Sequence, residues 1–445
     1  MNNEEVPTLL YGQQIDVNVV QQVLPVQRPF EFPKPKLVSF REEVSDIPNS
    51  QYLTHSLYFH PAKFIPQIVR YCLDNYCKED GVVLDPFAGS GTAALESSIK
   101  GYSSYMIDIN PLLNYFYPIK MPEFSLEEWN KHLEEAEIFL KEILEKEDTK
   151  ILDINGELAY WYPKELYNYF LNVWSNYHNL KKQRNEITQK IVILSLFKLS
   201  KLYSLAEHSM PKLFISKRKR VFIEKFMKDE NKKEIIQKKA FKFIEDINKA
   251  VLSLLNEEEL IGKIKYFSGV DAYGFDFTKI PKIDCIITSP PYLQAQEYIR
   301  TFKMEMRWSG ISNEKIKEYS SKEIPFRATE GRIEGDYINK IRSKLKKKSL
   351  INMFDSYFWF TIKSLEKASS RLNDGGKICV LIGNPKMEGI KVEIWKVIYE
   401  YFVKNLNYKP IKVFEDKIVS RKLFKGRNNL NPDGMKSEYL IVLEK

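Results

Sequence analysis

The sequence of 445 residues contains no uninterrupted apolar run of the roughly 18 or more residues that a membrane-spanning helix needs. The stretch from Met1 to Val6 lacks the basic and apolar regions of a secretory signal peptide. With 44% hydrophobic residues, the chain can form two or three domains with hydrophobic cores. These features predict a folded, soluble, cytoplasmic protein without a membrane segment.

Cysteine is also scarce. Cys72, Cys77, Cys285 and Cys379 are scattered, and their spacing matches neither a zinc site nor a disulfide framework. Three of them lie in apolar periodic segments, where buried, reduced thiols are common. We therefore predict no structural metal and no disulfide.

The glycine pattern of a dinucleotide-binding turn and the lysine pattern of a Walker loop are both absent. A strand, a glycine turn and a helix nevertheless follow one another from Val82 to Glu96, with Gly89 and Gly91 in the turn. A second apolar strand then ends at Asp108, where this architecture holds a ribose diol. The segment therefore predicts a nucleoside ligand.

A rigid polar corner follows the apolar run from Asp284 to Thr288. The prolines in Ser289-Pro290-Pro291-Tyr292 fix the backbone and remove two N–H donors, so the corner presents oxygen acceptors beside an aromatic ring. A base could stack on Tyr292 while its amino group donates to Ser289 and the Pro290 carbonyl. Taken alone, the motif fits a Pro-Pro turn that ends a core strand equally well.

The glycine turn of residues 85–92 and the corner of residues 288–292 together resemble the S-adenosylmethionine-dependent DNA amino-methyltransferases, which modify cytosine N4 or adenine N6. Residues 60–66 are similar to the family segment that closes over the methionine end of the cofactor, and residues 270–272 to the acidic turn that meets the adenine. The resemblance implies cofactor contacts from His60, Asp85, Pro86, Phe87, Ala88, Gly89, Ser90, Gly91, Thr92, Asp108 and Asp271, and catalytic roles for Ser289, Pro290, Pro291 and Tyr292.

The resemblance implies an α/β fold: a mostly parallel Rossmann-like methyltransferase sheet that ends in a reversed β-hairpin, here at residues 409–419 and 438–444. It further implies site-specific methylation of a base flipped out of double-stranded DNA, in a restriction-modification or related system with a possible cognate restriction endonuclease. Serine at the first position of the corner favours cytosine N4, and adenine N6 stays open. Carbon methylation of cytosine is disfavoured because the chain contains no Pro-Cys dipeptide.

Two other functions are compatible with the motifs. Related sheets with an Asn- or Asp-Pro-Pro-Tyr corner methylate RNA bases, although no RNA-binding module is evident in this chain. A catalytically silent DNA-binding subunit could retain the same fold, although the intact glycine turn and Tyr292 argue against it.

The alternation of strands and helices stops after Asp108 for about 150 residues. A helical periodicity replaces it and begins at a capping box, Ser125 to Glu128. We expect residues 51–118 and 262–445 to form the catalytic domain, residues 119–261 an inserted helical domain for DNA recognition, and residues 1–50 an extended arm. Residues 181–239 carry 17 Lys and Arg against 6 Asp and Glu, a surplus of 11 in a chain of net charge +9. The predicted DNA contacts are Lys212, Lys217, Arg218, Lys219, Arg220, Arg421, Lys425 and Arg427. A solvated, lysine-rich helical surface is the alternative.

Overall fold

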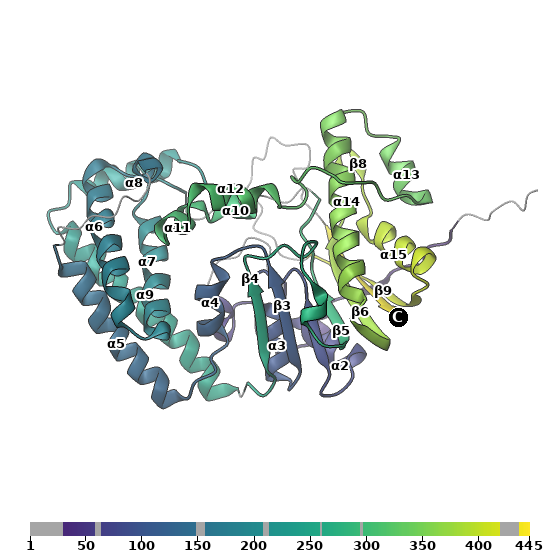
Figure 1. Ribbon diagram of the computed structural model, residues 1–445, viewed down its shortest axis with the longest axis horizontal. Coiled ribbons are helices and arrows are strands. Elements are labelled where there is room, and N and C mark those ends of the chain that lie inside the picture. Colours follow the sequence, from purple (N-terminus) through teal and green to yellow (C-terminus); the bar gives the residue numbers. More distant parts are fainter. Residues whose placement is uncertain are drawn as a thin grey trace, which may run out of the picture. The chain divides into compact units, whose positions relative to one another are not determined.

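The computed structural model describes residues 30–57, 64–147, 156–207, 213–258, 260–293, 297–418 and 436–445. The chain divides into two compact units, Met1–Phe32 and Pro33–Lys445. In the first unit, the rings of Phe30 and Phe32 meet edge to face with centroids 5.1 Å apart. The second unit contains the helices and strands of the described residues (Figure 1).

The centre of the second unit is an eight-stranded sheet. In spatial order its strands are β1 (Lys36–Val38), β9 (Lys409–Lys417), β10 (Ser437–Glu444), β6 (Leu372–Gly383), β5 (Ile283–Thr288), β2 (Val82–Asp85), β3 (Ser103–Asp108) and β4 (Ile264–Ser268). The strands from β6 to β4 pair in parallel, whereas β10 is antiparallel to both β6 and β9. The predicted α/β fold, with a reversed hairpin at its end, is confirmed.

The middle of the sheet is apolar on both faces because helices cover both faces. Strand β5 buries Ile283, Cys285, Ile286 and Ile287 completely. It pairs with β2 through Val83↔Cys285 and Leu84↔Ile286. After β2, the chain adds β3 and β4 on one side of β2 in the sheet. After β5, it adds β6 on the opposite side. The strand order therefore reverses between β2 and β5, which in such sheets opens a crevice at the carboxyl ends of the strands.

Helices pack against the sheet through two apolar clusters. One cluster joins the helices α1 (Phe40–Glu43), α2 (Pro66–Tyr76) and α3 (Thr92–Ile99) to β5, β6, β9 and β10, and includes the buried thiols Cys72, Cys285 and Cys379. All four cysteines are free. The helices α14 (Lys348–Ser369) and α15 (Ile394–Asn405) lie against β6.

A helical layer follows β3 in the chain, as the periodicity predicts. It consists of α4 (Leu113–Lys120), α5 (Leu126–Glu145), η2 (Gly156–Trp161), α6 (Lys164–Leu180), η3 (Lys181–Gln183), α7 (Glu186–Leu202), α8 (Lys217–Met227) and α9 (Lys232–Glu257). Figure 1 shows these helices beyond α4, on the β4 side of the sheet. The predicted capping box is present: Ser125 Oγ accepts from the Glu128 N–H at 3.2 Å, and the Ser125 N–H donates to Glu128 Oε2 at 2.8 Å.

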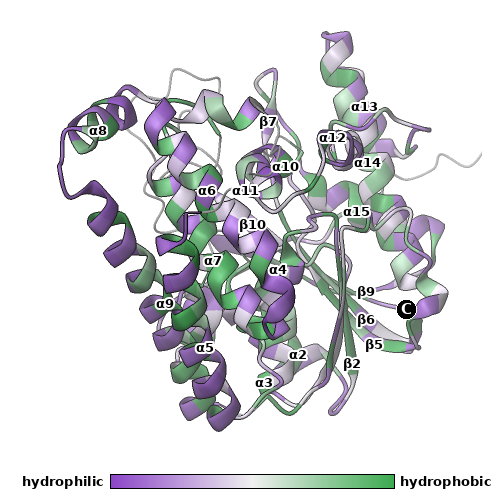
Figure 2. Ribbon diagram, turned by 60° about the vertical axis from the view of Figure 1, so that its left-hand side comes forward, coloured by the Kyte–Doolittle hydropathy of each residue, from purple (hydrophilic) through white to green (hydrophobic). Residues whose placement is uncertain are grey.

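The helical layer shares its core with the sheet. Trp129, Trp174 and Phe197 belong to the same buried cluster as Leu95 of α3 and Met106 of β3. The boundaries of the predicted inserted domain therefore stay a prediction. The helical pattern over 220–256 is interrupted in the structure, where residues 228–231 separate α8 from α9. Figure 2 shows both hydrophilic and hydrophobic residues on α8 and on α9.

Short helices connect β5 to β6. They are α10 (Tyr298–Thr301), α11 (Lys303–Trp308), α12 (Asn313–Ser321) and α13 (Asp336–Arg342), followed by α14. Between Glu314 and Leu350, residues 322–335 and 343–347 lie outside these helices. A small hairpin of β7 (Lys386–Met387) and β8 (Ile390–Lys391) follows β6. Within the described residues, no helix has the length and apolar character that a bilayer crossing requires.

Candidate functional site

A cavity of about 960 Å³, including its opening to solvent, lies at the carboxyl ends of β2, β3 and β5. Its lining contains most of the predicted site residues: Asp85, Pro86, Phe87, Ala88, Gly89, Ser90, Asp108, Asp271, Ser289, Pro290, Pro291 and Tyr292. Gly91 and Thr92 lie directly behind this lining, at the start of α3. The fold thus brings together two motifs that are separated by almost 200 residues in the chain.

The glycine turn is held against the sheet by backbone hydrogen bonds. The Ala88 N–H donates to the Ile107 carbonyl at 3.0 Å, and the Gly91 N–H to the Ala88 carbonyl at 2.8 Å. Gly89 and Gly91 both have positive φ, 51° and 72°. A Cβ atom on Gly91 would lie 2.9 Å from Cε1 of Tyr117. Glycine is therefore required here by both backbone conformation and space.

Helix α4 supports the turn from behind, which the motif alone does not reveal. The Tyr117 hydroxyl donates to the Gly89 carbonyl at 2.9 Å, and Lys120 Nζ donates to the Ser90 carbonyl at 2.6 Å. Both contacts tie backbone carbonyls of the turn to α4. No local signal in the sequence marks these two residues, because they belong to an ordinary amphipathic helix.

Asp108 ends β3 and faces the cavity. Its Oδ2 accepts from the Gly89 N–H and its Oδ1 from the Asn110 N–H, both at 2.8 Å. Burial raises the pKa of the Asp108 carboxyl, although these two hydrogen bonds oppose the shift. Each oxygen keeps acceptor capacity for a further donor, such as a hydroxyl of a diol.

Asp85, at the end of β2, is a second buried carboxyl at the cavity. Its Oδ1 accepts from the Thr288 hydroxyl at 2.6 Å and from the Phe87 N–H at 3.1 Å. Burial raises the pKa of Asp85 to about 7, and nearby Asp108 adds to this shift against the two hydrogen bonds. A cation bound next to Asp85 would restore the charged form of the carboxyl.

The polar corner after β5 borders the same cavity. Pro290 is buried, whereas Ser289, Pro291 and Tyr292 are partly exposed. The Tyr292 hydroxyl donates to Glu438 Oε1 at 2.7 Å. Burial, and then the charge of Glu438, raise the pKa of the Tyr292 phenol well above its usual value. Glu438 lies 146 residues away on β10 and is not among the predicted site residues.

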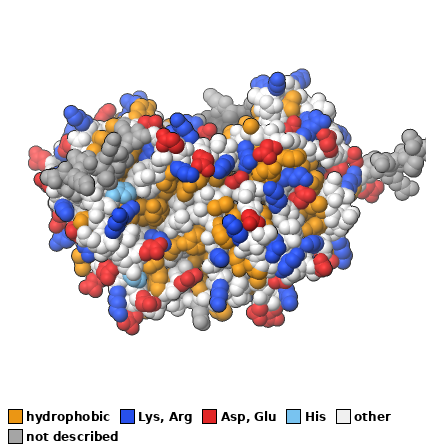
Figure 3. All heavy atoms as spheres, in the orientation of Figure 1, with side chains coloured by type: hydrophobic (Ala, Val, Ile, Leu, Met, Phe, Trp, Pro, Cys, Tyr) orange, Lys and Arg blue, Asp and Glu red, His pale blue; other side chains and the backbone are white. Residues whose placement is uncertain are grey.

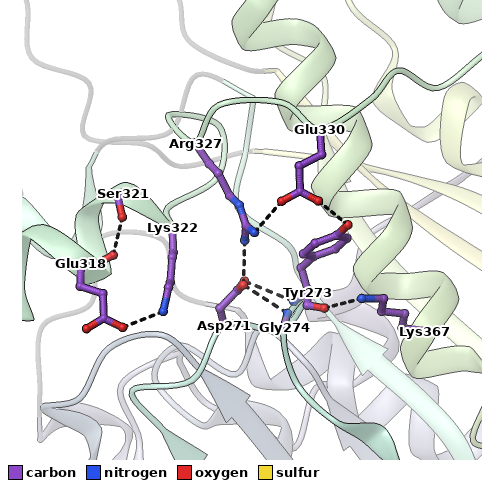
Figure 4. Close-up of polar contacts among 9 residues, drawn as sticks. All are labelled: Asp271, Tyr273, Gly274, Glu318, Ser321, Lys322, Arg327, Glu330 and Lys367. Carbon is purple, nitrogen blue, oxygen red and sulfur yellow. Dashed lines mark hydrogen bonds and ion pairs between the residues drawn. The ribbon is translucent and has the colours of Figure 1, made fainter.

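The lining also contains residues that were not predicted, among them Tyr298 on α10, and Lys322 and Glu323 after α12. Glu323 is buried, and its Oε1 accepts from the Ile299 N–H at 2.9 Å. Burial raises the pKa of Glu323 to about 7. Lys322 Nζ donates to Glu318 at 2.8 Å (Figure 4).

The acidic turn after β4 is fixed by its own contacts, as Figure 4 shows. Asp271 Oδ2 accepts from Arg327 Nη1 at 2.7 Å and from the Gly274 N–H at 3.2 Å. The Arg327 guanidinium also lies over the Phe360 ring, 4.1 Å from its centroid. The Asp271 carboxylate is thus neutralised by a positioned arginine at the edge of the cavity.

The predicted DNA contacts lie apart from the cavity or outside the described residues. His60 of the cofactor set, and Lys212, Arg421, Lys425 and Arg427 of the DNA set, fall outside those residues. Lys217, Arg218 and Arg220 are exposed on α8, and Arg218 Nη2 donates to Glu207 at 2.5 Å. Lys219 is 2% exposed, and its ammonium donates to the Leu202 carbonyl. Figure 3 shows basic and acidic side chains interspersed over the face in view.

The hydrogen-bond acceptors and carboxyls that line the cavity fit S-adenosylmethionine. That molecule carries two cations, a ribose diol and an exocyclic amine, all of which need acceptors or negative charge, and the cavity offers the carboxyls of Asp85 and Asp108 at a glycine turn. Within the described part of the chain, no group of three or more His, Cys, Asp or Glu side chains could hold a metal ion.

A mostly parallel sheet with a reversed terminal hairpin, and a glycine turn with a carboxylate at its switch point, define a Rossmann-like methyltransferase fold. Residues 40–121 match a family model described as DNA methylase. The chain is 23% identical over 434 residues to the Type II methyltransferase M.BsoBI of Geobacillus stearothermophilus, a match that covers 85% of this chain and 82% of that protein.

Two other relatives match shorter stretches. The Type II methyltransferase M.MjaII of Methanocaldococcus jannaschii is 32% identical over 79 residues, 18% of this chain and 15% of that protein. M.MvaI of Kocuria varians, also a Type II methyltransferase, is 29% identical over 98 residues, 21% of this chain and 22% of that protein. These similarities support a DNA amino-methyltransferase of the N4/N6 kind, and methyltransferases of this kind use S-adenosylmethionine as methyl donor.

Proposed function

We propose that the protein methylates the exocyclic N4 amine of a cytosine flipped out of double-stranded DNA, at a specific site. The observation that carries this proposal is the shared cavity of the glycine turn and the Ser289-Pro290-Pro291-Tyr292 corner. A methyl donor at the turn and an amine at the corner would be neighbours, and alignment of the reacting atoms supplies much of the catalysis in a displacement reaction.

The cofactor residues would divide the ligand between them. Asp108 accepts hydrogen bonds from the ribose diol, the backbone from Phe87 to Gly91 approaches the ligand closely, and Asp85 carries the charge that offsets a cation. The acidic turn at Asp271 borders the adenine, and His60 lies near the methionine end. S-adenosylmethionine supplies an activated methyl group on a sulfonium, which needs no metal for its transfer.

The corner would activate the amine. The lone pair of an aromatic amine is delocalised into the ring, so the amine is a weak nucleophile. Hydrogen bonds from its two protons to Ser289 Oγ and the Pro290 carbonyl favour a more tetrahedral nitrogen, whose lone pair is available for attack. Tyr292 stacks on the base and offsets part of the cost of unstacking it from the helix. Pro291 keeps this geometry rigid.

Cytosine N4 is preferred over adenine N6 because serine occupies the first position of the corner. The relatives named as Type II methyltransferases favour a role in a restriction-modification system, with a cognate restriction endonuclease as a possible partner. The helical layer of residues 119–261 is the proposed site of target recognition. Lys217, Arg218 and Arg220 are exposed on α8 and, with Lys212, Arg421, Lys425 and Arg427, make up the proposed phosphate contacts.

The test is to incubate the protein with duplex DNA and S-adenosylmethionine labelled in its methyl group, digest the DNA to nucleosides and identify the labelled species by mass. Label in N4-methylcytosine is expected. Label in N6-methyladenine would retain the mechanism but change the base. Absence of label in DNA despite tight cofactor binding would refute DNA methylation, and the same assay on RNA would then follow.

The matched variant for this assay is Tyr292→Ala. It removes the stacking ring at the corner but leaves the glycine turn intact, so methyl transfer should fall while cofactor affinity stays close to that of the wild type. Loss of cofactor binding in this variant would contradict the division of roles between the turn and the corner.

A further inference from the structure

The aromatic ring of the corner is tied to the last strand of the sheet. The Tyr292 hydroxyl donates to Glu438 Oε1 at 2.7 Å, and both side chains are partly buried. Tyr292 follows β5, whereas Glu438 is on β10, and β6 lies between these two strands. The β6 residue paired with Glu438 is Gly383, which has no side chain. The hydrogen bond can therefore span the intervening strand.

This contact restricts the ring more than packing alone does. A carboxylate only accepts hydrogen bonds, so the phenol must donate, and a bond to a charged acceptor is stronger than one between neutral groups. The hydroxyl oxygen lies on the axis about which the ring turns, so its contact with Glu438 fixes the direction of that axis. The phenolic proton prefers to lie in the plane of the ring, so the direction of the same hydrogen bond also favours one ring plane. The plane of the ring determines whether a base can stack on it.

The position of Glu438 has a cost for the fold. Its partner across the β9–β10 pair is Asp416, another acid, and like charges directly opposite one another destabilise a sheet. Burial raises the pKa of Asp416 to about 6, and Glu438 adds to that shift. The hydrogen bond from Tyr292 is a favourable contact of Glu438 that opposes this repulsion.

We propose that Glu438 is a positioning residue that holds the Tyr292 ring in the orientation needed to stack on the target base. The proposal rests on the function proposed above for the corner, and it adds a residue from the C-terminal strand to the site. Glu438 acts through Tyr292 and does not itself contact the reacting atoms.

The test is a double-mutant cycle with Glu438→Leu, Tyr292→Phe and the combination of both. Each single variant should lower kcat for methylation of duplex DNA by about tenfold, the effect of losing one charge-assisted hydrogen bond. The double variant should be no worse than Tyr292→Phe alone, because the two side chains act through one contact. Glu438→Gln keeps an acceptor oxygen and should recover most of the activity.

Two readouts separate positioning from a structural role. A duplex with 2-aminopurine at the target position should fluoresce more strongly when bound by Glu438→Leu than by wild type, because a base that is flipped but poorly stacked is less quenched. In Glu438→Leu, the dissociation constant for S-adenosylmethionine should stay within twofold of the wild-type value. The Tm should stay within a few degrees of the wild-type Tm. Glu444→Gln, on the same strand and paired with Lys377, is the control and should match wild type throughout.

Additive effects in the double variant would overturn the proposal, as would equal fluorescence of the wild-type and Glu438→Leu complexes. If wild type transfers no methyl group to DNA, the proposed function fails, and the role in base stacking fails with it. The contact itself is then tested by the NMR shift of a 13Cζ label in Tyr292, assigned with Tyr292→Phe. An unchanged shift in Glu438→Leu would show that Glu438 does not hold the ring.

Discussion

The Thr288 hydroxyl donates to Asp85 Oδ1 at 2.6 Å and so joins the last residues of β5 and β2, 203 positions apart in the chain. The bond connects β2 to β5, the two strands between which the strand order reverses. The glycine turn begins at Asp85, and the polar corner begins at Thr288. Both partners are almost fully buried. This side-chain bond therefore joins the two proposed halves of the site in addition to the backbone pairing of β2 with β5.

Replacement of Thr288 by valine, which has nearly the same shape, removes that hydrogen bond. The free energy of unfolding should fall by roughly 1.5–3 kcal/mol, because the buried Asp85 carboxyl loses one of the two donors that Oδ1 has in the wild type. Affinity for S-adenosylmethionine should fall as well, since the carboxylate form of Asp85 loses a stabilising contact. Urea unfolding and calorimetric titration measure the two effects. Thr288→Ser keeps the hydroxyl and should remain close to wild type in both; equal losses in the serine and valine variants would contradict this account.

The raised pKa of Asp85, about 7, predicts a pH dependence of cofactor binding. A cation binds the carboxylate in preference to the neutral acid, so affinity for S-adenosylmethionine should fall as the pH drops from 8 to 6. Below pH 7 the loss approaches about tenfold per pH unit at most, because one proton must leave. Titrations at several pH values, in buffers of different ionisation enthalpy, measure both the affinity and the released proton.

Asp85→Asn should bind more weakly at pH 8 and should lose this pH dependence. Glu323, whose pKa is also about 7, lines the same cavity. Glu323→Gln is therefore the matched variant, and it should retain the slope that Asp85 causes. If the slope survives in Asp85→Asn and vanishes in Glu323→Gln, the titrating group is Glu323 and the assignment of Asp85 is wrong.

The parts of the site that the sequence predicts are those with a local signature. The glycine turn and the Pro-Pro corner each end an apolar strand, and both carry residues whose backbone restrictions are visible without any partner. Because β2 and β5 are parallel neighbours, these ends meet. The terminal strand pair was likewise predicted, and the resemblance to the methyltransferases implied its reversed hairpin. Glu438, Glu323 and Lys120 carry no such signal, because their roles arise from contacts between distant segments.

The break between α8 and α9 is another feature that the local sequence pattern does not predict. Apolar residues from Phe222 to Leu255 keep a helical period across the break, so periodicity predicts one continuous element. The chain instead turns at residues 228–231, where the Asp229 side chain accepts from the Asn231 N–H at 2.9 Å. Such side-chain contacts compete with the helix backbone, and tertiary packing decides between the two.

Gly91→Ala should disrupt the glycine turn through two effects at once. Its φ of 72° is strained for alanine, and the new Cβ would lie 2.9 Å from the Tyr117 ring. Gly389→Ala is the matched control, with a φ of 81° but no heavy atom within 4 Å of the new Cβ. The control should lose about 1 kcal/mol of stability from backbone strain alone.

Gly91→Ala should lose clearly more stability than the control, and it should also lose affinity for S-adenosylmethionine, because the turn must shift away from Tyr117. Urea unfolding of the two variants, followed by cofactor titration, measures the difference. Equal destabilisation would mean that the ring moves aside without cost, and unchanged cofactor affinity would remove Gly91 from the proposed cofactor set.

Behind the glycine turn, Glu96 of α3 is the centre of a buried charge cluster. Its carboxylate accepts from Arg70 Nε and from the Tyr52 hydroxyl, both at 2.5 Å, and lies 2.7 Å from His55 Nε2. Burial alone would raise the pKa of Glu96, but His55, Arg70 and Tyr52 outweigh it, so the pKa is lowered. A lowered pKa adds stability above the usual pKa of glutamate, and this stability is lost as the pH falls through the lowered value.

Glu96→Leu should therefore destabilise the protein by roughly 3–5 kcal/mol near pH 7, because it leaves the buried Arg70 guanidinium without its carboxylate. The double variant Glu96→Leu/Arg70→Leu should recover much of this loss, since neither charge then remains buried. Wild type should also lose stability more steeply below pH 4.5 than the double variant does. Urea unfolding at pH 4 and pH 7 measures all of these differences. A double variant less stable than Glu96→Leu would mean that the Arg70 side chain stabilises this region by packing, independently of its charge.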